Sequence, residues 1–103
     1  MKKIFVYGIL QKDISAKHFG IKDDYYVGRA KLHGFWRNSL TAIFNRGNKE
    51  DMVEGDIFEV PDDIEESLYR FEHQYGYHRE ITKPVRISDG KTFETISYLL
   101  PQR

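Results

Sequence analysis

The sequence has no cysteine, only three prolines and no long apolar run. Without cysteine the chain uses neither disulfides nor thiolate chemistry, which fits a reducing compartment. A membrane-spanning helix needs about 20 apolar residues, whereas the N-terminal stretch from Ile4 to Leu10 is short and includes Tyr7 and Gly8. We therefore expect a strand there rather than a signal peptide or membrane anchor, and a cytoplasmic protein.

The chain also lacks an excess of either charge, since 16 Lys and Arg residues balance 16 Asp and Glu residues. Nucleic-acid affinity rests largely on concentrated positive charge, so the balance argues against nucleic-acid partners. An RNA-associated module is a hypothesis that this balance counts against. The residues that favour it are Lys2, Lys3, Arg37, Arg46 and the aromatic residues.

Common signatures of nucleotide binding and serine hydrolysis are missing as well. The sequence has no Gly-rich phosphate loop and no serine in a Gly-x-Ser-x-Gly context. His73 and His78 flank Tyr75-Gly76 beside Glu72, but their spacing matches no helical or hairpin pattern of metal ligands. We expect neither a metal ion nor another cofactor.

What is present indicates one domain, residues 1–103, built mainly from strands. Apolar or alternating segments predict strands at residues 4–7, 25–32, 42–44, 52–60, 77–87 and 92–99. Gly34 breaks or bulges the second of these, and Gly55 indicates a close backbone approach. The segment from Ser88 to Lys91 is typical of a hairpin turn.

One main helix is predicted to follow Pro61. Asp62 is placed as its N-cap acceptor, with Glu65 three residues later. The apolar stripe of this helix falls on Ile64, Leu68 and Phe71. Several strands with one main helix indicate an α+β fold, either a small mixed β-barrel or a strongly curled sheet.

Glu72 is the candidate catalytic residue that the pattern itself suggests. It lies near the C-terminal end of the helix, where the helix dipole disfavours a carboxylate, and it flanks the apolar stripe. Both effects raise the pKa of a carboxyl group toward the range of a general base. The alternative is that Glu72 pairs with Arg79 or Lys91, or simply reaches solvent.

Three segments, in this order, resemble the gamma-glutamylcyclotransferase-like family, which includes AIG2-like and gamma-glutamylamine cyclotransferase-like proteins. An apolar strand ends in Tyr7-Gly8-Ile9-Leu10, which resembles the family's Tyr-Gly-Thr-Leu turn. Residues 53–58 are similar to its Val-x-Gly-Glu-hydrophobic-Tyr strand, and residues 68–79 to its Leu-Asp-x-x-Glu run followed by Tyr-x-Arg. The resemblance covers most of the chain and implies a compact barrel-like fold.

The resemblance implies a reaction that needs no cofactor. A small-molecule substrate, a γ-glutamyl amine or γ-glutamyl peptide, cyclises by intramolecular aminolysis to 5-oxoproline and a released amine, a reaction of acyltransferase or cyclising-lyase type. Glu72 is implied as general acid and base, and the backbone N–H groups of the turn as oxyanion donors. The substrate-binding residues that it implies are Tyr7, Gly8, Ile9, Leu10, Tyr77 and Arg79.

Several residues depart from the family pattern around the implied pocket. Ile9 stands for the usual Thr, Gln11 for a basic residue, Tyr69 for Asp and His73 for Gly. These changes favour an alternative, a non-catalytic relative that binds a small ligand or a protein partner on the same fold.

Overall fold

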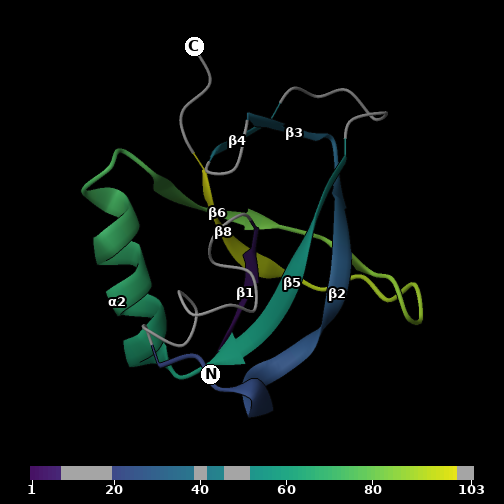
Figure 1. Cartoon of the computed structure of the whole chain (residues 1–103), viewed down its shortest axis with the longest axis horizontal. Helices are drawn as coiled ribbons and strands as arrows, with labels where there is room; N and C mark the ends of the chain where they lie inside the picture. The colour runs from purple at the N-terminus through teal and green to yellow at the C-terminus, as the bar shows by residue number, and fades with distance from the viewer. Residues whose placement is uncertain (8–19, 39–41, 46–51, 100–103) are drawn as a thin grey trace.

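The computed structural model describes residues 1–7, 20–38, 42–45 and 52–99. Figure 1 shows its helix α2 packed along one side of a curled sheet, with β2 and β5 on the other side. The elements in chain order are β1 (Lys2–Val6), the 3-10 helix η2 (Asp23–Tyr25), β2 (Tyr26–His33), β3 (Phe35–Asn38), β4 (Ala42–Asn45), β5 (Met52–Val60), α2 (Asp62–His73), β6 (His78–Thr82), β7 (Val85–Arg86) and β8 (Thr95–Leu99).

Six of the strands form one mixed sheet in the order β6-β8-β1-β5-β2-β7, and β3 pairs separately with β4. The neighbours β1 and β8 are parallel, while the other neighbouring strands of this sheet are antiparallel. The two outer strands, β6 and β7, are separated in sequence by Lys83 and Pro84 alone. Three peptide units span at most about 11 Å, so the sheet curls until its edges come near each other.

This arrangement confirms the α+β prediction in its curled-sheet form. The described strands make an open sheet with two edges rather than a closed barrel. α2 is the one α-helix in the described part of the chain. No helix within these residues has the length and apolar character needed to span a membrane.

Most predicted strands are present, but residues 77–87 form two strands instead of one. Pro84 has no N–H group to donate to a sheet, and the ladder stops before it. β6 pairs with β8, whereas β7 crosses to the opposite edge and pairs Arg86 with Ala30 of β2. The predicted turn after it is present, because the Asp89 carboxylate accepts a hydrogen bond from the Lys91 N–H at 3.2 Å.

Gly55 and Gly34 act as the sequence predicted. A Cβ atom added to Gly55 would lie 2.3 Å from the carbonyl oxygen of Val6 and 2.8 Å from the ring of Phe5. β5 therefore approaches β1 at a position that admits only glycine. Gly34 has a φ of 86°, a conformation that other residues rarely adopt, and it separates β2 from β3. β3 itself was not predicted.

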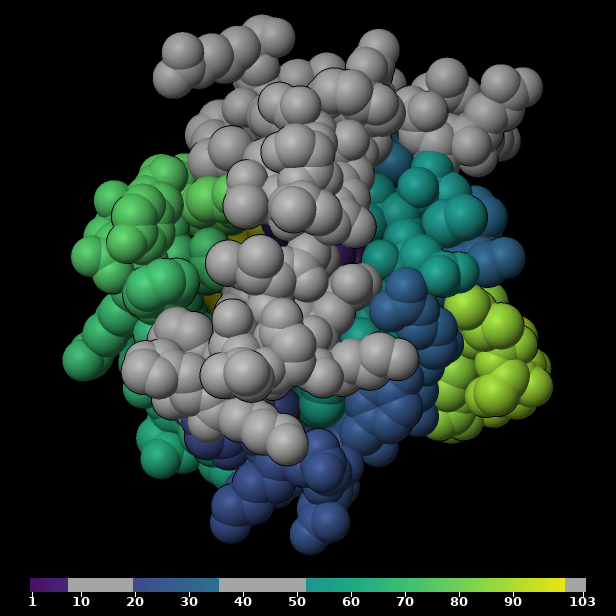
Figure 2. Space-filling model, viewed as in Figure 1, coloured from purple at the N-terminus to yellow at the C-terminus, as the bar shows by residue number. Residues whose placement is uncertain are grey.

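Apolar side chains cover both faces of the sheet, because successive residues of each strand point to opposite faces. α2 covers one face and contributes Leu68 to it. The buried residues of that face are Ile4, Val6, Ile21, Phe58, Val60, Leu68 and Tyr98. The buried residues of the other face are Phe5, Tyr7, Ala30, Leu32, Val53, Ile57 and Leu99. Figure 2 shows the side chains of α2 and those of β2 on opposite flanks of the molecule.

The start of α2 differs from its prediction by one residue. Pro61, not Asp62, is the N-cap residue, and no side chain caps the helix. The Pro61 carbonyl accepts hydrogen bonds from the N–H groups of Ile64 and Glu65 at 3.1 and 3.2 Å. Proline already has a restricted φ, so it starts the helix without a capping side chain, and the acidic first turn suits the positive end of the helix dipole.

The buried stripe of α2 is also turned by about one residue from the predicted one. Glu65 and Leu68 are fully buried, whereas Ile64 and Phe71 are only partly buried. A stripe centred on positions 65, 68 and 72 brings Glu72 onto the face that packs against the sheet. The rotation therefore places two carboxylates, not one, on the inner side of the helix.

Candidate active site

Glu72 is the penultimate residue of α2 and is half-buried. Burial raises the pKa of its carboxyl group to about 7, because the charged form loses hydration. The predicted rise is therefore present. The alternative pairings are not, since no hydrogen bond or ion pair joins the Glu72 carboxylate to another described residue, and Lys91 lies over the ring of Phe93.

The chain reverses directly after Glu72 through a Schellman motif. The carbonyl of Glu72 accepts the N–H of Tyr77 at 3.2 Å, and that of His73 accepts the N–H of Gly76 at 3.0 Å. Gly76 has a φ of 91°, as the residue after such a helix end requires. This local geometry brings Tyr77 beside Glu72, and its half-buried ring packs against the core on the helix side of the sheet.

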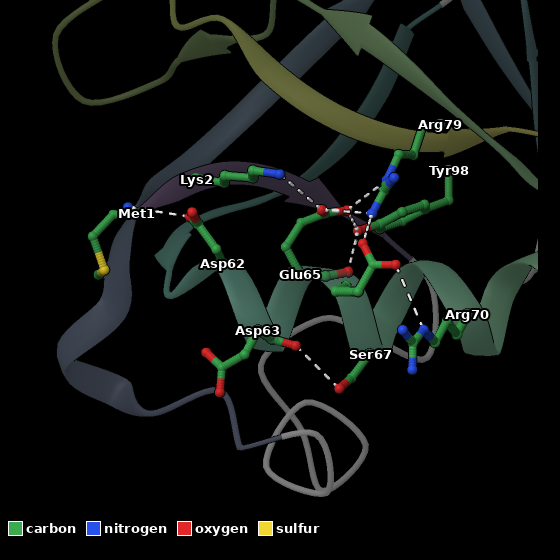
Figure 3. A network of polar contacts seen from close by, with 10 residues as sticks. Met1, Lys2, Asp62, Asp63, Glu65, Ser67, Arg70, Arg79 and Tyr98 are labelled. Atoms are coloured by element: carbon green, nitrogen blue, oxygen red, sulfur yellow. Dashed lines mark hydrogen bonds and ion pairs between the residues drawn. The ribbon is translucent and has the colours of Figure 1, made fainter.

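Arg79 binds the first turn of α2 and not its last. Its Nε and Nη2 atoms donate to the two carboxylate oxygens of Glu65 at 3.0 and 2.9 Å. Nη2 also donates to Glu66 at 2.6 Å, and the guanidinium lies 3.7 Å from the centre of the Tyr69 ring. Figure 3 shows this fork reaching from β6 onto the helix. Arg79 thus fixes α2 to the sheet.

Glu65 is a fully buried carboxylate that sequence reasoning treated only as part of a helix start. Besides Arg79, it accepts a hydrogen bond from the Tyr98 hydroxyl at 2.7 Å, and the ammonium group of Lys2 lies 3.5 Å away. A buried charge is stable only with such partners. The available signal was its spacing, because residues 65, 68 and 72 lie on one helix face.

Tyr98, on β8, was missed as well, and it connects the first turn of α2 to Tyr7, the residue after β1. Burial, its hydrogen bond to Glu65 and the negative charges of Glu65 and Glu72 all raise the pKa of the Tyr98 hydroxyl. Its backbone carbonyl accepts a hydrogen bond of 2.7 Å from the hydroxyl of the buried Tyr7. No sequence signal separated Tyr98 from other strand aromatics.

Of the predicted site residues, Glu72 and Tyr77 lie together at the C-terminal end of α2, whereas Arg79 is bound to the first turn of that helix. Tyr7 packs on the opposite face of the sheet, where its hydroxyl donates to the Tyr98 carbonyl. Gly8, Ile9 and Leu10 lie outside the described residues, as does Gln11.

The two histidines near Glu72 have separate surroundings. His73 stacks on Tyr69 with ring centres 5.2 Å apart, and the Nε2 of His78 lies 3.0 Å from a carboxylate oxygen of Glu80. No group of three or more possible metal ligands occurs within the described residues. Glu72 is a described carboxyl group whose raised pKa suits proton transfer at neutral pH.

Comparison with known proteins gives a family match along almost the whole chain. The family model described as "Gamma-glutamyl cyclotransferase, AIG2-like" matches residues 4–103. A comparison with curated proteins found no match.

Solved structures share the fold at low sequence identity. A protein from Arabidopsis thaliana has a TM-score of 0.79 and 21% identity, with 96% of this chain and 61% of that protein covered. A gamma-glutamyl cyclotransferase has a TM-score of 0.70 and 20% identity, covering 96% and 66%. An AIG2-like protein from Mus musculus has a TM-score of 0.69 and 19% identity, covering 96% and 76%. The chain thus spans less than two thirds of the first two of these proteins.

Proposed function

Because this chain belongs to the gamma-glutamyl cyclotransferase, AIG2-like family, we propose that it cyclises the γ-glutamyl group of a small γ-glutamyl amine or γ-glutamyl peptide. The products are 5-oxoproline and a free amine. The observation that carries the proposal is Glu72, a half-buried carboxyl group with a pKa of about 7 at the end of α2. Near neutral pH about half of such groups are ionised, so the same residue is able to accept and return a proton.

In the proposed reaction Glu72 first takes a proton from the α-ammonium group of the substrate. The freed amine attacks the γ-carbonyl carbon, and the new C–N bond closes the five-membered ring with negative charge on the carbonyl oxygen. The ring nitrogen still holds two protons at this stage and carries a positive charge. When the intermediate collapses, the original amide C–N bond breaks and Glu72 gives its proton to the departing nitrogen. Glu72 then accepts the second proton of the ring nitrogen and passes it to the released amine, so that 5-oxoproline keeps one N–H and the amine leaves as its ammonium ion. No protein nucleophile or cofactor enters the balance.

The barrier to ring closure falls when the amine and the carbonyl are held together and the oxyanion meets fixed donors. We assign the donors to the backbone N–H groups of Gly8, Ile9 and Leu10. Tyr7 and Tyr77 contact the glutamyl portion, and Arg79 acts by ordering the helix that carries Glu72, consistent with its bonds to Glu65.

The test is to incubate the purified protein with γ-glutamyl amines, γ-glutamyl amino acids and glutathione, and to follow 5-oxoproline by mass spectrometry. Glu72→Gln removes the base with little change in shape, and Glu59→Gln, at an exposed pair with Lys3, is the matched control. We expect product from the wild type and from Glu59→Gln, and none above background from Glu72→Gln. Equal turnover by all three proteins would exclude Glu72 as the base.

A second candidate is a non-catalytic module on the same fold, favoured by Ile9, Gln11 and His73 at positions where the family pattern has other residues. Such a protein would bind a γ-glutamyl compound without converting it. Ligand-detected NMR with the same panel distinguishes the two functions, because saturation transfer without 5-oxoproline formation supports binding alone.

A further inference from the structure

A set of polar contacts, joined through Tyr98, links the first turn of α2 to Tyr7, the residue after β1. Glu65 on the helix accepts the Tyr98 hydroxyl at 2.7 Å, and the Tyr98 carbonyl accepts the Tyr7 hydroxyl at 2.7 Å. Glu65, Tyr98 and Tyr7 are each at most 9% exposed, so water competes little for these bonds. Figure 3 shows Tyr98 and Arg79 meeting the Glu65 carboxylate from the sheet side.

These hydrogen bonds restrict the position and rotation of α2, which its apolar contacts alone do not. Leu68 and its apolar neighbours hold the helix against the sheet, but burial of apolar surface is not directional. Hydrogen bonds have defined lengths and angles, and the bonds of Glu65 are made to two separate strands, β6 through Arg79 and β8 through Tyr98. They therefore define how far the helix slides and rotates on the sheet.

We propose that Glu65 and Tyr98 are positioning residues that set the place of Glu72 relative to Tyr7. Glu72 lies two helical turns beyond Glu65, about 10 Å along the axis, and Tyr7 follows β1 and directly precedes the proposed substrate-binding residues in sequence. The inference rests on the proposed function, since it concerns the geometry between its base and its substrate-binding end. Neither positioning residue takes part in proton transfer.

Two variants interrupt the set at different points. Tyr98→Phe removes the hydroxyl that reaches Glu65 and keeps the carbonyl that Tyr7 uses. Glu65→Gln removes the charge while retaining the size of the side chain. Glu66→Gln is the matched control, because Glu66 also pairs with Arg79, at 2.6 Å, but its described contacts are to Arg79 and Arg70 and not to Tyr98.

The first readout is steady-state kinetics with a γ-glutamyl substrate that the wild type converts, well below the melting temperature of each variant. A misplaced catalytic group costs about tenfold to a hundredfold, so we expect kcat/KM to fall by that range in Tyr98→Phe and Glu65→Gln, with KM raised. A purely structural loss would lower the active fraction and leave KM unchanged. The double variant should lose no more than the worse single one, because both interrupt one path.

The second readout does not depend on turnover. In amide NMR spectra we expect Glu65→Gln to shift the resonances of Tyr7 and Glu72, which do not contact residue 65 through any described hydrogen bond, and Glu66→Gln to leave both in place. If the wild type converts no γ-glutamyl compound, the proposed function fails. The resonance shifts still decide whether the hydrogen bonds of Glu65 and Tyr98 set the positions of Tyr7 and Glu72.

Unchanged KM together with unchanged Tyr7 and Glu72 resonances in folded Glu65→Gln and Tyr98→Phe overturns the inference. Equal effects of Glu66→Gln overturn it too, because they would trace the coupling to Arg79 rather than to Tyr98. If Glu65→Gln does not fold, Tyr98→Phe, which loses one hydroxyl group, decides the question with the same two readouts.

Discussion

The two ends of helix α2 carry carboxylates of the same chemistry in opposite situations. Glu65, in the first turn, is fully buried and bound by Arg79, Tyr98 and Lys2. Glu72, in the last turn, is half-buried, and its carboxylate has no charged partner among the described residues, so its pKa rises to about 7. Burial with partners fixes a structure, whereas burial without them prepares a group for proton transfer.

The largest expected effect comes from removing the carboxylate at the catalytic end. Glu72→Gln should lower the rate of 5-oxoproline formation by about 10² to 10⁴, the range typical of general acid–base catalysis. The folded protein should be no less stable, since a neutral amide replaces a group whose charge is poorly solvated. Initial rates together with urea unfolding check both halves of this prediction, and a stability loss equal to the activity loss would contradict it.

Removing the cation that binds Glu65, in the first turn of α2, should instead cause a large loss of stability. Arg79→Met leaves the buried Glu65 carboxylate without its main cation, and such losses cost about 3–5 kcal/mol. The free energy of unfolding in urea at pH 7 measures this cost. A loss below about 1 kcal/mol would mean that the pair behaves like a surface ion pair and does not hold the helix.

The free energy of unfolding should also depend on pH through Glu72, and the sign of that dependence follows from its raised pKa. The pKa of Glu72 is raised from its ordinary value of 4.5 to about 7 on folding, so the folded state binds more protons between these values than the unfolded state. The contribution of Glu72 to stability is therefore full below about pH 4.5 and is lost as the pH rises through about 7.

Urea unfolding of wild type and Glu72→Gln at a series of pH values isolates this contribution, since all other titrating groups are shared. The wild type should lose stability relative to the variant between about pH 5 and about pH 8. A constant difference across that range would show that the pKa of Glu72 is the same in the folded and unfolded states.

The smallest effect is expected at the exposed surface of the same helix. Arg70 pairs with Glu66 at 3.5 Å, but its side chain is 78% exposed. Arg70→Met should change the free energy of unfolding by less than about 0.5 kcal/mol and leave turnover unchanged. The free energies of unfolding of Arg70→Met and Arg79→Met should be compared. The comparison shows whether stability falls when any guanidinium group of this region is removed, or only when the one that neutralises a buried carboxylate is removed.

Local patterns were sufficient for the parts of the fold that depend on neighbours in sequence. β5 occupies residues 52–60 as predicted, Gly55 marks a close backbone approach, and the hairpin turn at Asp89 is present. The rise in the pKa of Glu72 also followed from local information, its position on the helix and beside the apolar stripe.

The remainder depends on partners far away in sequence. Whether residues 77–87 make one strand or two is decided by where β6 and β7 find pairing strands, at opposite edges of the sheet. Arg79 was expected to bind substrate or to pair with Glu72, yet its partner is Glu65, 14 residues away. The buried stripe of α2 was predicted about one residue away from its observed position. Because adjacent helix positions differ by about 100°, this error left Glu65 outside the predicted buried face.

The most direct measurement is a pH titration of the Glu72 side-chain carboxyl carbon by ¹³C NMR in the folded protein. We predict a midpoint of about 7, the value that burial without a partner produces. A midpoint near the ordinary value of 4.5 would contradict it, because Glu72 would then be a solvated surface carboxylate and the two ends of α2 would not differ in the way described.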